Sequence, residues 1–516
     1  MADLLAAVIA TPHTVNKQES GAILGLNDEQ FIELKEQAIA YAASHGLLVS
    51  LHDQSKPQDV SSAFTHIPFC LLPIQFPRKH FELGMELSPI YGRLVDRVSR
   101  DVEWLHSCVQ SVVAEDAFTG RLLELSRLVQ KEGVQQQTYL GLHRSDYMLH
   151  EPQTDKSSDS QRLLQLLRVK HAQVGLDEIV DSCVSVSDFT ANSFLVNRFG
   201  DIPALEKHYG ITSGDYSKGL PQNDAILELP NALAAAHKHY GVKKCARWLF
   251  LNPNEANAID QRWLEYNLWE HHGICVLRLT LADVDACGKL VERDGKRTLV
   301  LDGREVAVAY FRAAYTPNDY PTEQEWAGRT IIERSYAIKC PSIAYHLAGT
   351  KKVQQVLAQP AVLRRFVAEE EALQLEQSFA GLYGLERNSP TIEDVKKMAI
   401  TNPHMYVLKP QREGGGNNLY GDDVASAIQK MSPAELESFI LMERIFPKEN
   451  PAVLVRNSCS SSGCTISELG MFITSLFDGE GKEIINKHAG HLLRTKLSGT
   501  DEGGVATGFS VQPGSI

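Results

Sequence analysis

The sequence has no excess of positive charge and no apolar run long enough to span a membrane. Among its 516 residues, 51 Lys and Arg are outnumbered by 64 Asp and Glu, and the formal net charge is −13. Such a chain has no general attraction for nucleic acid or anionic lipid, so local basic residues must meet any anionic ligand. The short apolar run near the N-terminus contains Asp3 and has no basic residues before it. We therefore expect a cytoplasmic protein with no nucleic-acid or membrane partner.

Cysteine is sparse, and its spacing matches no standard metal motif. Nine cysteines are scattered along the chain without a Cys-x-x-Cys pair. An odd number of this kind fits reduced thiols better than a disulfide framework. Cys459 and Cys464 lie a little before His488 and His491, but these spacings match no standard zinc finger. We interpret the four as unrelated loop and strand residues.

Two common phosphate-binding motifs, the Walker motif and the Gly-x-Gly-x-x-Gly turn, are also missing. Residues 408–423 instead read LKPQREGGGNNLYGDD. Glycine backbone can approach phosphate oxygens closely, and Lys409 can neutralise the inner phosphates from a strand. A carboxylate at Glu413 would be repelled by phosphates unless a cation such as Mg²⁺ lay between them. The segment therefore predicts a movable loop over a polyphosphate, carried by a hairpin, with Mg²⁺ at Glu413.

The first third of the sequence has the periodicity of amphipathic helices. Apolar residues recur three to four apart between Asn27, a capping residue, and Gly46, which ends the pattern. A second apolar stripe from Leu94 to Val112 predicts one longer helix. Both stripes are typical of core packing.

Strands and helices alternate after the polar segment 151–162. Residues 247–280 predict a strand, a helix and a second strand, which together form a βαβ unit. Asp302-Gly303, between two apolar runs, predicts a two-residue hairpin turn. Helical patterns follow from residue 323 to residue 360 and again up to about Asn388. Strands are predicted at 405–410, 438–447, 464–477 and 483–497.

The glycine-rich segment resembles the corresponding loop of eukaryotic glutathione synthetases, which are ATP-grasp carbon–nitrogen ligases. Other blocks are similar to the same family, in the family's order, over nearly the whole chain. They are HRSDYM at 143–148, NAIDQ at 257–261, AYFRAAYTPNDYPTEQEW at 309–326, KCPSIAYHLAGTKKVQQ at 339–355, FAGLYGLE at 379–386, ILMERIFPK at 440–448, ISELG at 466–470 and HLLRTKLSGTDEGGVATG at 491–508.

The resemblance implies an α/β (α+β) ATP-grasp fold in four parts. Residues 1–150 would be the helical N-terminal part of the body, and residues 151–242 a substrate-contacting segment with a linker. Residues 243–350 would form an inserted βαβ substrate-binding lobe, and residues 351–516 the ATP-binding region with its glycine-loop lid. The family also implies a homodimer.

The implied reaction joins γ-glutamylcysteine to glycine through an acyl phosphate, with ATP as co-substrate and Mg²⁺ as cofactor. Arg494, Lys351 and Lys409 would be the catalytic residues, and Glu413 the metal ligand. The residues that would bind ATP are Lys351, Lys409, Arg412, Glu413, Gly414, Gly415, Gly416, Asn417, Asn418, Tyr420, Met442, Glu443, Arg444, Ile445, Glu468, Lys496 and Glu502. Those that would bind the other substrates are Arg144, Glu255, Asn257, Gln261, Arg312, Tyr315, Arg494, Val505 and Ala506.

One block departs from the family pattern. The family has a Glu-x-Asn motif after RSDYM, which supplies two magnesium ligands, whereas residues 163–189 of this chain contain none. Aligning the segments puts Lys170 and Ala172 at the ligand positions, and Asp177 or Glu178 would be possible substitutes. An inactive nucleotide- or peptide-binding homologue is therefore one alternative function. A homoglutathione synthetase that uses β-alanine is the other, although Ala506 favours the smaller glycine.

Overall fold

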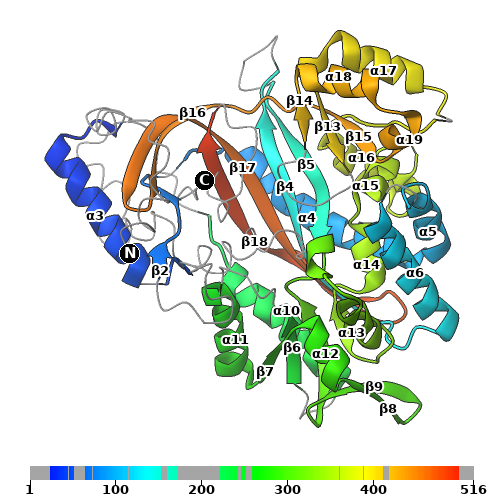
Figure 1. Ribbon diagram of the computed structural model, residues 1–516. Coiled ribbons are helices and arrows are strands. Elements are labelled where there is room, and N and C mark those ends of the chain that lie inside the picture. Colours follow the sequence, from blue (N-terminus) through cyan, green and yellow to red (C-terminus); the bar gives the residue numbers. More distant parts are fainter. Residues whose placement is uncertain are drawn as a thin grey trace.

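The computed structural model of the protein describes residues 24–44, 46–50, 64–72, 74–113, 116–152, 160–171, 221–241, 246–250, 258–359, 361–387, 389–410 and 418–498. Three sheets of four to six strands lie within these residues, and a small β-hairpin accompanies them. Helices lie between and around the sheets, so the described chain is a mixed α/β protein (Figure 1).

A six-stranded antiparallel sheet forms the centre of the molecule (Figure 1). The strand order is β3, β16, β17, β4 and β5. β16 and β4 pair with successive parts of one edge of the long strand β17, and β18 pairs with its opposite edge. The strands are β3 (Phe69–Cys70), β4 (Tyr139–His150), β5 (Arg162–His171), β16 (Asn450–Arg456), β17 (Cys459–Phe477) and β18 (Glu483–Leu497). The strands predicted at 464–477 and 483–497 are thereby confirmed as one long hairpin, β17–β18.

Helices cover both faces of the central sheet. α4 (Arg78–Arg100) and α10 (Ala225–Tyr240) both pack against β17 and β18. Successive side chains of a strand point to opposite faces. Met471 and Ile473 accordingly join the hydrophobic core that contains α4, whereas Phe472 joins the core that contains α10. The face of α10 is the one that also carries the functional side chains described below.

The long helix predicted from Leu94 to Val112 is wrong, because the chain breaks at Asp101. α4 ends at Arg100, and α5 (Val102–Gln110) begins with the Asp101 carboxylate accepting a hydrogen bond from Trp104 N at 3.2 Å. A short acidic side chain competes for backbone N–H groups and so starts a new helix. Further helices pack on this side of the molecule: α6 (Ala117–Glu132), α14 (Ile343–Ala348), α15 (Lys351–Leu357), the 3₁₀ turn η3 (Leu363–Arg365) and α16 (Glu369–Gln377).

α3 (Asp28–Ser44) confirms the first predicted helix, with Asn27 accepting a hydrogen bond from Gln30 N at 2.9 Å. Gly46 follows the helix with a φ of +85°, a conformation that favours glycine. α3 shares a core with Val453 and Val455 of β16. A small hairpin of β1 (Leu48–Ser50) and β2 (Phe64–His66) lies beside it.

A second six-stranded sheet forms a lobe below the central sheet in Figure 1. Its elements are β6 (Ala246–Phe250), α11 (Ala258–His272), β7 (Val276–Leu279), α12 (Leu281–Cys287), β8 (Lys289–Arg293), β9 (Lys296–Leu301), β10 (Arg304–Phe311), the 3₁₀ turn η2 (Pro317–Asp319), α13 (Glu323–Glu333) and β11 (Ile338–Cys340). β6 and β7 are parallel neighbours, which confirms the βαβ unit. Asp302 and Gly303, with φ of 48° and 74°, turn the chain between β9 and β10, as predicted. The helical pattern predicted from 323 to 360 is interrupted by β11, which pairs with β10.

A four-stranded sheet lies at the upper right of Figure 1. It contains β12 (Leu382–Gly384), β13 (Tyr406–Pro410), β14 (Leu419–Tyr420) and β15 (Phe439–Glu443), with α17 (Ile392–Thr401), the 3₁₀ turn η4 (Pro403–Met405), α18 (Asp422–Lys430) and α19 (Pro433–Glu437). β13 and β14 pair antiparallel, so the predicted hairpin is confirmed. Helix up to Asn388 is wrong, because α16 ends at Gln377 and β12 then pairs with β15. Pairing with a strand 60 residues away in sequence outweighed the local helical pattern.

Candidate active site

Four charged side chains from the central sheet form a buried cluster. Arg144 and Asp146 lie two residues apart on β4, so both point to the same face. On the neighbouring strands, Glu468 of β17 and Arg494 of β18 are direct cross-strand partners. We call these four side chains the open-end cluster, because they lie far along the β17–β18 hairpin from its turn.

The open-end cluster alternates positive and negative charges. The Arg144 guanidinium binds Asp146 through two hydrogen bonds along one edge, Nε–Oδ1 at 2.5 Å and Nη2–Oδ2 at 2.8 Å. Arg494 Nη2 lies 3.8 Å from Asp146 Oδ2 and forms an ion pair with Glu468. Arg144 and Asp146 are each 1% exposed, and Arg494 is 4% exposed. Paired charges with this little exposure to water attract one another more strongly than surface pairs do.

Gly470 makes room for the cluster on β17. A Cβ added to Gly470 would lie 2.9 Å from Arg144 Cδ and 3.1 Å from Asp146 Oδ1. Gly470 is the cross-strand partner of Asp146. A side chain at this position would therefore push on the ion pair itself, and the sequence ISELG provides the required gap.

Lys351 and Lys409, both predicted to bind phosphates, come from different elements but converge. Lys351 is the first residue of α15, and its Nζ donates a hydrogen bond to Pro410 O at 2.7 Å. Lys409 is the residue before Pro410 on β13. Lys351 and Lys409 are only 4% and 8% exposed. The Lys351 ammonium thus lies at the end of β13, where the glycine-rich segment leaves the sheet, and Asn418 and Tyr420 lie where it returns.

Four residues predicted to bind ATP, Met442 to Ile445, lie at the end of β15 and directly after it. Met442 and Ile445 are buried and share a small core with Met148 of β4, which joins this sheet to the central one. The N–H of Glu443 donates to Gly381 O at 2.9 Å, and the N–H of Arg444 donates to Met405 O at 2.8 Å. The Arg444 guanidinium lies 5.9 Å from the centre of the Tyr420 ring. Both N–H groups are therefore already used by the fold, and so is the Glu443 carboxylate, which accepts hydrogen bonds from Gly381 N at 3.1 Å and from Tyr383 Oη at 2.9 Å.

The remaining described substrate residues lie on the lobe. Gln261, on α11, is 1% exposed, and its Oε1 accepts a hydrogen bond from Arg278 Nη1 at 2.9 Å. Arg312 follows β10 and is 2% exposed. The Tyr315 N–H donates to Asp319 Oδ2 at 3.0 Å, which fixes the loop after Arg312. These three residues belong to elements other than the strands of the open-end cluster.

Lys496 lies on β18 two residues beyond Arg494 and on the same face. Several other predicted site residues lie outside the described residues. They are Arg412, Glu413, Gly414, Gly415, Gly416, Asn417, Glu255, Asn257, Glu502, Val505 and Ala506, together with Ala172, Asp177 and Glu178 of the departing block.

Asp146 was not among the predicted site residues, although it lies within the HRSDYM block. The available signal was its spacing from Arg144, because two oppositely charged residues at i and i+2 share one face of a strand. His143 precedes Arg144 on β4 and faces the other way, and its Nε2 shares a hydrogen bond of 3.0 Å with Ser475 Oγ. Burial lowers the pKa of His143 to about 3, so this side chain is neutral at ordinary pH.

The described carboxylates at this site do not by themselves form a magnesium site. Asp146 and Glu468 are both engaged by guanidinium groups, and no group of three His, Cys, Asp or Glu side chains with metal-binding geometry occurs in the described part of the chain. The backbone of β5 places Lys170 opposite Arg144 and Leu167 opposite Asp146. Within the described residues, Cys459, Cys464, His488 and His491 belong to no group of three or more His, Cys, Asp or Glu side chains that could hold a metal ion.

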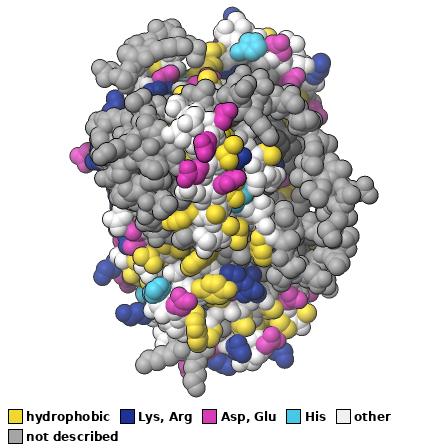
Figure 2. All heavy atoms as spheres, turned by 90° about the vertical axis from the view of Figure 1, so that its left-hand side faces the viewer, with side chains coloured by type: hydrophobic (Ala, Val, Ile, Leu, Met, Phe, Trp, Pro, Cys, Tyr) yellow, Lys and Arg dark blue, Asp and Glu magenta, His cyan; other side chains and the backbone are white. Residues whose placement is uncertain are grey.

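Side chains of both charges lie on the face shown in Figure 2. On the face shown in Figure 2, acidic side chains lie around the middle, and Lys and Arg lie mostly toward the lower part. No helix within the described residues is long and apolar enough to cross a membrane.

Comparisons with known proteins place this site in context. The family model described as the ATP binding domain of eukaryotic glutathione synthase matches residues 28–513. A chloroplastic glutathione synthetase of Solanum lycopersicum is 40% identical over 93% of this chain and 83% of its own length. A glutathione synthetase of Dictyostelium discoideum is 39% identical over 94% of this chain and 98% of its own length. The solved structure of a glutathione synthetase-like effector from Globodera pallida, in apo form, superposes with a TM-score of 0.70 at 21% identity and covers 95% of this chain and 97% of that one. This last likeness supports the α/β ATP-grasp fold.

Proposed function

Since the chain belongs to the eukaryotic glutathione synthase family, we propose that it makes glutathione by joining γ-glutamylcysteine to glycine at the site described above. The chain is accordingly an ATP-using ligase. The observation that carries the proposed site is the open-end cluster, because it holds two buried guanidinium groups beside each other on rigid strands. Arginine forks bind carboxylates selectively and remain charged at any physiological pH.

In the proposed reaction a carboxylate oxygen of γ-glutamylcysteine attacks the γ-phosphorus of ATP, and ADP leaves. The amine of glycine then attacks the carbonyl carbon of this acyl phosphate, and phosphate leaves with the former carboxylate oxygen as the amine loses a proton. Negative charge gathers on the transferring phosphoryl group. Lys351 and Lys409 approach this region from α15 and β13, and Arg494 is the cation we assign to the reacting carboxylate.

Mg²⁺ would come to the site with the ATP phosphates, and Glu413 is the protein ligand that we assign to it. Mg²⁺ commonly binds one or two carboxylates together with substrate phosphates, and it neutralises charge on those phosphates when bound. Glu413→Gln keeps the shape of the side chain and removes its charge. We expect this variant to need more Mg²⁺ for half-maximal activity with unchanged thermal stability, and a magnesium titration that matches the wild type would argue against the assignment.

The segment 502–508 would close over the amine substrate, with Ala506 as its nearer wall. A pocket that discriminates by one methylene group does so by about 1–3 kcal/mol. We therefore expect glycine to be preferred over β-alanine. The ratio of kcat/KM for the two amines, at saturating ATP and γ-glutamylcysteine, measures this preference, and a ratio in favour of β-alanine would point to homoglutathione synthesis.

We also propose that the protein is a cytoplasmic homodimer. The seven cysteines in the described residues are all free thiols, which suits a reducing compartment. Light scattering of the purified protein tests the dimer, and a fluorescent fusion of the full chain tests the compartment against a plastid.

The proposed function is tested most simply by omitting one substrate at a time. ADP release from the purified protein should require both γ-glutamylcysteine and an amine. ADP release without either one, or no release with all three substrates, would contradict the ligase reaction and favour the inactive nucleotide- or peptide-binding alternative.

A further inference from the structure

Asp146 lies between the two arginines of the open-end cluster. Its Oδ1 and Oδ2 accept hydrogen bonds from Arg144 at 2.5 and 2.8 Å, and Oδ2 is also 3.8 Å from Arg494 Nη2. A single carboxylate therefore binds one guanidinium in a two-point fork and faces a second one. Two-point binding fixes the plane of a guanidinium as well as its position.

The two carboxylates of the cluster differ in their access to water. The Asp146 side chain is 1% exposed, whereas the Glu468 side chain is 23% exposed. A buried carboxylate with no route to water stays with its partner, because separating the charges inside the protein is costly. The more exposed Glu468 can exchange Arg494 for another partner. Asp146 is thus the fixed anion of the cluster, and Glu468 is the exchangeable one.

The arginines need a fixed anion when a substrate is absent and when Glu468 is engaged elsewhere. Without Asp146, Arg144 and Arg494 would be two buried like charges on nearby strands, and they would repel each other. Gly470 supports this arrangement, because the lack of a side chain there leaves room for the Arg144–Asp146 pair.

We propose that Asp146 is a positioning residue for substrate binding: it holds Arg144 and Arg494 side by side so that both face the anionic substrate, while Glu468 gives up Arg494 when nucleotide binds. This proposal rests on the proposed function, because it takes γ-glutamylcysteine as the anionic substrate. Asp146 touches no reacting atom in this account and acts only through the arginines.

The test compares Asp146→Asn with a matched variant elsewhere in the protein. Asp96 is also a buried aspartate, 2% exposed, and it binds Arg100 Nε at 2.8 Å. Asp96→Asn therefore removes a similar charge from a similar ion pair, but at the other end of the same hairpin. Both variants are purified as full-length protein, and KM for γ-glutamylcysteine, KM for ATP and kcat are measured with glycine saturating.

For Asp146→Asn we expect KM for γ-glutamylcysteine to rise about tenfold or more, since a buried guanidinium loses its ionic partner, with KM for ATP changed much less. Asp96→Asn should lower thermal stability and leave both KM values as in the wild type. A role in stability alone would predict the same pattern in both variants. Equal KM for γ-glutamylcysteine in Asp146→Asn and wild type, or an equal rise in both variants, would overturn the proposal.

Asp146→Glu keeps the negative charge, and it is the variant to measure if Asp146→Asn does not fold. Its carboxylate is displaced by one methylene group, so we expect a rise of a few fold in KM for γ-glutamylcysteine, and an unchanged KM would overturn the proposal. Calorimetry can measure the binding of γ-glutamylcysteine to the wild type and the variants without ATP or glycine. This measurement separates the positioning role of Asp146 from the proposed ligase function. If the wild type binds γ-glutamylcysteine but does not ligate it, the proposed function is wrong. The affinities of the Asp146 variants and the wild type for γ-glutamylcysteine would still test the role of Asp146.

Discussion

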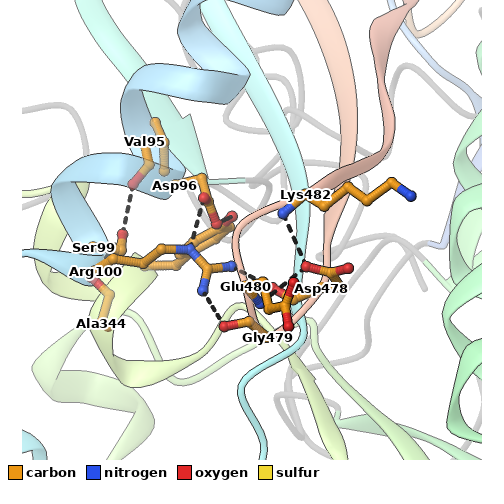
Figure 3. A network of polar contacts seen from close by, with 10 residues as sticks. Val95, Asp96, Ser99, Arg100, Ala344, Asp478, Gly479, Glu480 and Lys482 are labelled. Carbon is orange, nitrogen blue, oxygen red and sulfur yellow. Dashed lines mark hydrogen bonds and ion pairs between the residues drawn. The ribbon is translucent and has the colours of Figure 1, made fainter. Parts of the chain in front are cut away.

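Each end of the β17–β18 hairpin lies at a buried aspartate that is paired with an arginine, but the two pairs are completed in different ways. At the turn, Arg100 of α4 binds Asp96 at 2.8 Å and also donates to Asp478 O at 2.8 Å and Gly479 O at 3.4 Å (Figure 3). The Tyr139 ring lies beneath its guanidinium at 4.7 Å. Carbonyls, a carboxylate and a ring thus satisfy this arginine from within the fold. It fastens the hairpin turn to α4.

The open end contains two arginines and two carboxylates instead, which pair with one another. Glu468 and the turn residue Asp478 are ten residues apart, which is about 30 Å along a strand. An aspartate–arginine pair therefore holds the hairpin turn against α4 at one end. At the other end, a similar pair lies beside Glu468, which can exchange its partner. At the turn, backbone carbonyls complete the ion pair, which indicates a structural role. At the open end, the partly exposed Glu468 is an additional partner, which indicates a binding site.

Arg494→Lys should have the largest effect of the changes considered. Lysine keeps the charge but cannot form the fork that contacts Glu468 and faces Asp146. We expect kcat to fall by about 10²–10³-fold, as for loss of one charge-stabilising donor, with little change in thermal stability. Steady-state kinetics and a thermal melt measure both quantities.

Arg100→Lys is the matched change at the turn, and it should give the opposite pattern, with reduced stability and wild-type kcat. If both variants lose activity to the same degree, the distinction between the two ends of the hairpin is wrong.

Gly470→Ala should disturb the open end through packing alone. The new methyl group would lie within 3.1 Å of both Arg144 and Asp146, so the ion pair must move. We expect kcat/KM for γ-glutamylcysteine to fall by about tenfold or more. Gly463→Ala on the same strand is the control, because its methyl group would meet only Leu497 Cδ2, at 3.2 Å. Equal kinetics for the two variants would show that the gap at Gly470 is not needed.

Acid should destabilise the protein through three buried histidines, two on β18 and one on α14. Burial lowers the pKa of His491 and of His346 to about 3, and that of His488 to about 4. The unfolded chain, with ordinary values near 6.5, binds more protons than the fold between pH 6.5 and these values, so stability falls as pH falls through that window. Each histidine contributes up to about 1.4 kcal/mol per pH unit.

Urea unfolding at pH 7, 6 and 5 measures this effect, and His491→Gln should flatten the pH dependence. His491 also packs edge-on against Phe81 with 4.9 Å between the ring centres, so the variant requires its own stability at pH 7 as the reference. A free energy of unfolding that stays constant from pH 7 to pH 5 would show that these histidines are not kept neutral by the fold.

The sequence predicted the elements that depend on local patterns and missed what depends on distant partners. The β17–β18 strands, the βαβ unit and the β13–β14 hairpin were all predicted. Their signals, apolar patterns within each element and turn residues between neighbouring elements, lie within a short stretch of sequence. β12 and the break at Asp101 were not, since pairing with β15 and a single capping carboxylate outweigh the local periodicity.

The candidate site divides in the same way. The resemblance to known motifs supplied Arg144, Glu468 and Arg494 as separate residues. Their assembly into one cluster joins residues 350 positions apart, which only the register of the central sheet determines. The role of Asp146 follows from that register and from its burial, neither of which a motif records.

Oxygen transfer measures whether the open end of the hairpin activates a carboxylate for ligation. γ-Glutamylcysteine labelled with ¹⁸O in its cysteinyl carboxylate is incubated with the purified protein, ATP and glycine, and the inorganic phosphate is analysed by mass spectrometry. An acyl phosphate intermediate predicts that each glutathione formed is accompanied by one phosphate carrying one ¹⁸O atom. Unlabelled phosphate, formed while glutathione accumulates or while ATP is consumed without it, would contradict the account.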